Sequence, residues 1–241
     1  MSGQPTRAGW AERVPAEWRR FAAYLRNPVL PDRAVISLLG SARALPPLFV
    51  LDLVLMAIVL GAIGVATALG LKLPEHMLNE LQLSPALIAF IVVGAPIAEE
   101  ALFRGWLSGR PGHVLAVVAL LVGGAMMVLV PEPMVKLVGV AGGLTAAIAA
   151  LFTLRGRPAL PWFQRHFRWF YYASALLFAA MHLTNFAAGG ISPTFLPLVL
   201  PQLMLGLVLG YIRVNYGLFT GAALHMLHNA AFAGLMLLGA S

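Results

Sequence analysis

The sequence predicts an all-α, polytopic integral membrane helical bundle with about seven transmembrane helices. Only 10% of its 241 residues are charged and 60% are hydrophobic, whereas soluble domains carry about 25% charged residues. The apolar residues form long runs, and a membrane-spanning helix needs about 20 such residues. Barrel strands would be about ten residues long. Seven runs meet the helical requirement: 46–71, 83–108, 113–130, 134–154, 169–187, 194–214 and 217–239.

Charge and cysteine content narrow the functional classes. The net charge of +7 resides in short segments between apolar runs, which is typical of membrane topology rather than of nucleic-acid binding. We therefore expect a lipid bilayer as partner and no nucleic acid. The chain contains no cysteine, which excludes disulfides and thiolate metal ligands.

Two regions are predicted, an N-terminal arm over 1–45 and a membrane-embedded catalytic domain over 46–241. The arm is mixed polar and basic and does not resemble a cleaved signal. Trp10, Trp18, Phe21 and Tyr24 alternate there with arginines. This mixture fits an amphipathic helix on an anionic membrane surface, and a solvated arm fits it equally well.

The distribution of Lys and Arg predicts the orientation. With a cytoplasmic N-terminus, 14 of the 16 basic residues fall in cytoplasmic segments, leaving only Lys72 and Lys136 outside. We expect a multi-pass protein whose C-terminus lies on the opposite side of the membrane from its N-terminus.

Two adjacent carboxylates, Glu99 and Glu100, lie inside the second apolar run. Neighbouring helical residues point about 100° apart, so the two carboxylates are not expected to share one partner. Arg104 follows Glu100 by four residues, on the same helix face. The simplest interpretation pairs Glu100 with Arg104 and leaves Glu99 for another task.

Two further runs carry polar groups, and together with Glu99 they form a candidate site. His182 ends the fifth run, four residues after Phe178, and the seventh contains His225 and Asn229 on one face. Glu and His transfer protons and can ligate zinc, and Asn can donate hydrogen bonds to an oxyanion. Structural roles remain open for every polar residue in these runs. His228 could equally join helices, Asn185 is expected to cap a helix, and Asp52 is expected to pair with an interfacial arginine.

The spacing Glu99-Glu100-x-x-x-Arg104, Phe178-x-x-x-His182 and His225-x-x-x-Asn229 resembles the three-motif signature of the CPBP family. These are CAAX-processing and bacteriocin-processing (Abi-type) intramembrane proteases. The resemblance covers residues 85–235. It implies that Glu99 is a general base, that His182 holds the water, and that His225 and Asn229 stabilise the oxyanion. Glu100, Arg104 and Phe178 would support the helices. Zinc could bind Glu99, His182 and His225, but a metal-free mechanism would use the same residues.

The expected function is an intramembrane endopeptidase acting on a membrane-associated substrate, which by resemblance could be a prenylated CAAX-type peptide. A proton-coupled transporter or a non-catalytic membrane scaffold is the alternative. If hydrolysis is correct, the polar atoms of Glu99, His182 and Asn229 should meet in one intramembrane cavity that opens toward the cytoplasm or sideways. His225 should lie within about 12 Å of Glu99, and His228 should point away.

Overall fold

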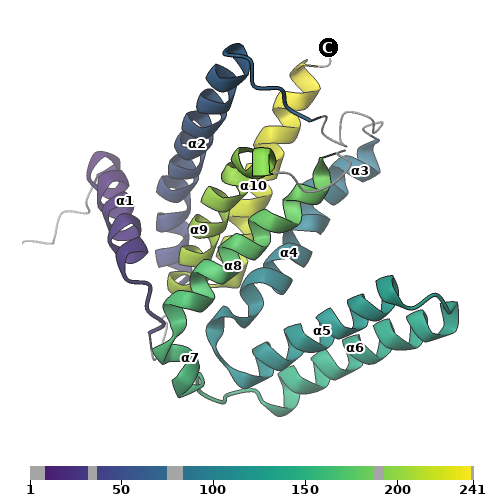
Figure 1. Ribbon diagram of the computed structural model, residues 1–241. Coiled ribbons are helices and arrows are strands. Elements are labelled where there is room, and N and C mark those ends of the chain that lie inside the picture. The colour runs from purple at the N-terminus through teal and green to yellow at the C-terminus, as the bar shows by residue number, and fades with distance from the viewer. Residues whose placement is uncertain (1–8, 32–36, 75–83, 187–192, 240–241) are drawn as a thin grey trace, which may run out of the picture.

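The computed structural model describes residues 9–31, 37–74, 84–186 and 193–239, and its regular elements within these ranges are helices (Figure 1). The all-α architecture is therefore confirmed. The α-helices are α1 (Trp10–Arg26), α2 (Leu38–Ala68), α3 (Pro85–Ala89), α4 (Ala95–Arg104), α5 (Pro111–Leu129), α6 (Pro133–Thr153), α7 (Pro161–Arg165), α8 (Phe167–Met181), α9 (Leu200–Asn215) and α10 (Leu218–Gly239). Shorter π- and 3₁₀-helical segments are η2 (Phe90–Gly94), η3 (Gly105–Ser108), η4 (His182–Asn185) and η5 (Pro193–Val199).

Six of the seven predicted runs are helices long and apolar enough to span a membrane, counted over the described ranges. The remaining run, 169–187, contains a helix shorter than expected. It contains α8, which has 15 residues and ends at Met181, where η4 takes over. The first span begins at Leu38 rather than near residue 46. Its polar start is accommodated because the Ser41 hydroxyl donates to the Tyr216 carbonyl at 3.1 Å.

Helix α9 lies at the centre of the bundle, in contact with α2, α8 and α10 (Figure 1). Its span is 61% buried, more than that of any other candidate span among the described residues. Glycines on α9 allow α8 to approach closely. A Cβ on Gly210 would lie 2.8 Å from the ring of Tyr171, and one on Gly206 would lie 3.3 Å from Ala175 Cα. The sequence of α9 thus permits the close α8–α9 contact that helps position the site.

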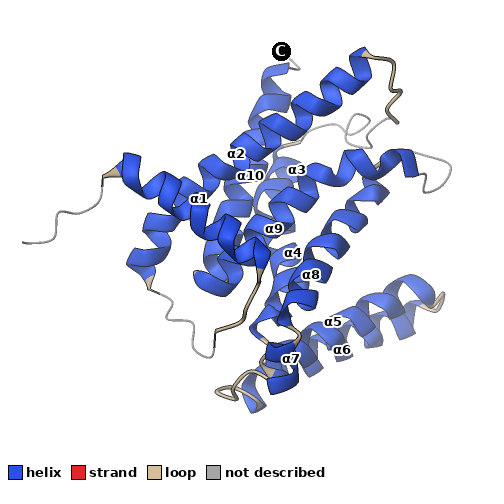
Figure 2. Ribbon diagram, turned by 60° about the vertical axis from the view of Figure 1, so that its left-hand side comes forward, coloured by secondary structure: helices blue, strands red, loops and turns tan. Residues whose placement is uncertain are grey.

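Helices α5 and α6 form a hairpin, which projects away from the rest of the bundle (Figure 2). Their contact is a seam of small residues, since a Cβ on Gly123 would lie 2.9 Å from the Gly139 carbonyl oxygen. The hairpin contributes no residue to the polar cluster described below.

Helix α1 packs one face against the bundle. Phe21 is buried, and the buried Glu17 carboxylate accepts hydrogen bonds from the hydroxyls of Tyr211 (2.8 Å) and Tyr216 (2.6 Å). Burial, reinforced by the bond to Glu17, raises the pKa of Tyr216 to about 12. The arm is therefore anchored to the protein at this face, and contact of its outer face with anionic lipid stays a prediction.

Candidate active site

Glu99 and Glu100 lie in α4, directly after the π-helical segment η2. Glu100 is 1% exposed and accepts a hydrogen bond from Arg104 Nη1 at 3.0 Å, so the predicted i,i+4 pair is present. The Arg104 guanidinium also lies over the Phe178 ring, 3.9 Å from its centroid. Gly206 makes room for this stack, because a Cβ there would approach Arg104 Nη2 to 3.3 Å.

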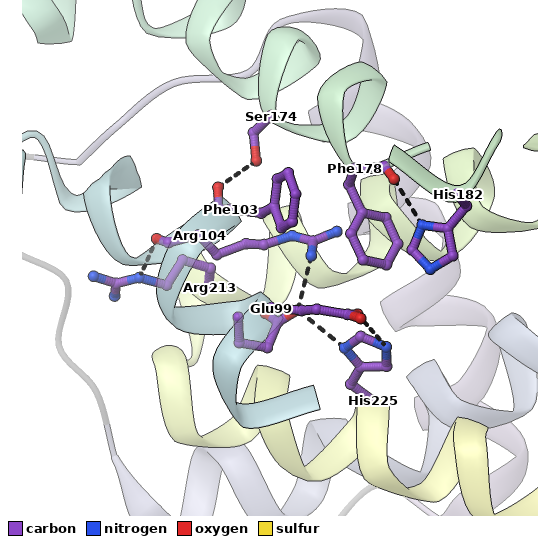
Figure 3. A network of polar contacts seen from close by, with 9 residues as sticks. Glu99, Phe103, Arg104, Ser174, Phe178, His182, Arg213 and His225 are labelled. Carbon is purple, nitrogen blue, oxygen red and sulfur yellow. Dashed lines mark hydrogen bonds and ion pairs between the residues drawn. The ribbon is translucent and has the colours of Figure 1, made fainter. Parts of the chain in front are cut away.

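His225 from α10 bridges the two carboxylates (Figure 3). Its Nε2 lies 3.5 Å from Glu99 Oε2, and its Nδ1 lies 3.3 Å from Glu100 Oε1. The expectation that adjacent glutamates cannot share one partner is therefore wrong. The backbone positions do diverge, but glutamate side chains are long enough to converge, and the imidazole offers each of them a different nitrogen. The 3.5 Å separation is far below the 12 Å limit set for a common site.

A cavity of about 680 Å³ lies beside this cluster, and Glu99, His182 and Asn229 all line it. His182 Nδ1 donates to the Phe178 carbonyl at 2.8 Å, so Nε2 is the nitrogen that accepts hydrogen bonds when the ring is neutral. Asn229 Nδ2 donates to the carbonyl of Ile91 in η2 at 2.8 Å. An amide has two N–H groups, so Asn229 keeps one donor beyond this bond. Three of the four predicted catalytic side chains thus face one cavity, and His225 is buried behind Glu99.

A family model described as "Type II CAAX prenyl endopeptidase Rce1-like" matches residues 81–231, more than half of the chain. The chain belongs to this Rce1-like family. No curated protein and no solved structure matched it in the corresponding searches. Membership supports intramembrane protease activity, and with the long apolar helices it identifies a multi-pass integral membrane protein. The matched segment contains the three motifs and begins after α2.

The lining of the cavity combines polar and apolar side chains. The polar ones come from α4, η4, α9 and α10, and apolar side chains of α2 and the last turns of α10 form part of the wall. Those apolar wall residues are Met56, Leu60, Ile63, Phe232, Met236 and Leu237. A lining of this mixed kind can accommodate a ligand that has both polar and apolar parts.

The lining residues show where the cavity lies along the helices. It is lined in part by the C-terminal halves of α2 and α10, by η4 and by the start of α9. Arg168 and Arg213 lie at the opposite ends of α8 and α9. The lining residues therefore lie away from the arginine-rich end of the bundle, and the expected opening toward the cytoplasm or between helices stays a prediction.

The donor set does not form a zinc site in this structure. Within the described ranges, no three His, Asp or Glu side chains are grouped as metal ligands. Both nitrogens of His225 instead face carboxylates. Glu99, His182 and His225 thus do not fit the zinc arrangement that they could have formed, and no reaction step is assigned to a metal.

Two predictions about neighbouring residues are wrong. His228 lines the cavity instead of pointing away from it. The wall is formed by α2, α4 and α10 together, so side chains from more than one face of α10 reach it. Asp52 pairs with His228 Nδ1 at 2.7 Å and not with an interfacial arginine. The sequence shows Asp52 as a lone carboxylate in the first apolar run. It does not indicate the partner of Asp52, because that partner lies 176 residues away. Asn185, expected as a helix cap, also lines the cavity.

Proposed function

We propose that this protein is an intramembrane endopeptidase that hydrolyses a peptide bond of a membrane-associated substrate, with Glu99 as general base. The observation that carries the proposal is the Glu99–His225 pair at the wall of a cavity shared with His182 and Asn229. A carboxylate that is held by an imidazole and faces a cavity large enough for water and substrate is suited to accept a proton from an attacking water.

The roles of the remaining residues follow from their contacts. His225 orients Glu99, while Glu100 and Arg104 hold His225 and α4 in place. His182 helps to position the water, and the second N–H of Asn229 donates to the oxyanion that forms as water adds to the carbonyl.

We further propose a prenylated C-terminal peptide as the substrate class. The family description designates prenyl endopeptidases, and the apolar side chains that α2 and α10 contribute to the cavity wall offer a lipid-like environment for an isoprenoid. The test is release of the C-terminal tripeptide from a farnesylated CAAX peptide by the purified protein in liposomes. We expect cleavage of this peptide, much slower cleavage of the unprenylated peptide, and an unchanged rate after dialysis against a metal chelator. Cleavage of neither peptide would contradict the proposal.

The proposed orientation places the N-terminus in the cytoplasm. Reporter fusions after Arg26 and in the 155–168 connection should be cytoplasmic, because the arginines there favour that side. Fusions at the C-terminus and in the 186–193 connection should report the opposite side. Most of that last connection lies outside the described residues. A cytoplasmic C-terminus would overturn the predicted number of crossings.

A further inference from the structure

A second ionisable pair lies on the wall of the same cavity. Asp52, on α2, is fully buried, and its Oδ2 lies 2.7 Å from Nδ1 of His228 on α10. The segment matched by the Rce1-like family model begins at residue 81, so Asp52 lies outside it. The mechanism proposed above uses neither residue.

The contact fixes the chemistry of the His228 ring. An ionised carboxylate only accepts hydrogen bonds, so Nδ1 carries the proton shared with Asp52. Nε2 is then the ring nitrogen that exchanges protons with a molecule in the cavity. The Phe232 ring lies 4.6 Å from the imidazole, centroid to centroid, and limits its rotation. His228 is thus an oriented histidine facing the space that Glu99 and Asn229 also face.

A purely structural role explains this pair poorly. Asp52 Oδ1 is buried and has no hydrogen-bond partner among the described residues. Burying a carboxylate with an unsatisfied oxygen is costly, and an apolar pair would join α2 to α10 without that penalty. A carboxylate that orients a cavity-facing histidine is, by contrast, a recurring arrangement for acid–base chemistry.

We propose that His228, oriented by Asp52, is the proton donor to the leaving amine. The inference rests on the proposed endopeptidase function. As the water oxygen bonds to the carbonyl carbon, Glu99 takes the water proton. In this step His228 starts as an imidazolium, with one proton on Nδ1 toward Asp52 and a second proton on Nε2. When the tetrahedral intermediate collapses, the C–N bond breaks and the nitrogen takes the Nε2 proton, which leaves the His228 ring neutral. The proton on Glu99 then passes through water to His228. One water is consumed, and a carboxylic acid and an amine are produced.

The leaving group provides the test. Two prenylated substrates share one acyl part and differ in the leaving group, which is an amide in one and a p-nitrophenyl ester in the other. A nitrophenolate leaves without protonation, so it needs no acid. We expect His228→Asn, whose amide nitrogen can keep the bond to Asp52, to slow amide cleavage about 100-fold or more. Ester cleavage should stay within about threefold of the wild type.

Asp52 is assigned a positioning role, and its substitution should show the same selectivity. Asp52→Asn should slow the amide reaction while sparing the ester, and the double substitution should be no slower on the amide than His228→Asn alone. Thermal melting of each variant checks folding, and His228→Gln replaces His228→Asn if the latter does not fold. Equal losses on both substrates, or an undiminished amide rate, would overturn the proposal. Failure of the proposed function would look different, because Glu99→Gln would then retain cleavage of both substrates or the wild type would cleave neither.

Discussion

Glu99→Gln should abolish peptide cleavage while the protein remains folded. The amide keeps the shape of the side chain but cannot accept the water proton, and loss of a general base costs about 10²–10⁴-fold in rate. Glu99 is the more exposed of the two glutamates, with 20% of its side chain accessible, and its contact with His225 is a 3.5 Å ion pair. We therefore expect the Tm to stay within about 4 °C of the wild type, which is about 1 kcal/mol for a chain of this size.

The measurement is tripeptide release in liposomes together with thermal melting in detergent. Glu132→Gln is the matched control, because Glu132 is exposed in the α5–α6 connection, far from the cluster. This control should match the wild type in both assays. Substantial activity of Glu99→Gln would show that the base lies elsewhere.

Glu100→Gln should act mainly on stability. The substitution removes the ionised partner of Arg104, whose side chain is 0% exposed and whose Nε and Nη2 already have no hydrogen-bond partner among the described residues. Removing one member of a buried ion pair costs about 3–5 kcal/mol. We expect the Tm to fall by roughly 6–20 °C, as measured by thermal melting in detergent.

A paired substitution separates the lost charge from a change of shape. Glu100→Gln combined with Arg104→Met removes both charges and keeps an apolar chain against Phe178, so it should recover part of the lost Tm. Wild-type stability of Glu100→Gln combined with complete loss of activity would reverse the roles assigned to the two glutamates.

Local patterns in the sequence predicted the features that depend on neighbouring residues. The Glu100–Arg104 pair follows from four-residue spacing on one helix. The α5–α6 hairpin follows from two apolar runs separated by a Pro-Glu-Pro turn. The three motifs predicted three of the side chains that line the cavity, Glu99, His182 and Asn229, because each motif is a short continuous stretch of helical chain.

Interactions between distant helices could not be predicted in this way. His225 reaches both glutamates because α4 and α10 pack with one imidazole between them. The partner of Asp52 depends on the rotation of α2 and α10 about their own axes. The rotation of a helix about its axis is set by packing against its neighbours. Helices that are apolar on nearly all faces have little amphipathic pattern, so their sequences give little indication of which face is buried.

The sequence by itself determined that this chain is a helical membrane protein with an ionisable site. A bilayer requires long apolar helices, and ionisable side chains within them are costly and therefore usually functional. The sequence also predicted the candidate catalytic residues, through three short motifs. Tertiary structure alone decided that His225 bridges two carboxylates, that the cavity extends away from the arginine-rich end, and that Asp52 holds His228 at its wall. These features depend on side-chain reach and helix packing across more than a hundred residues, where no local pattern specifies the partner.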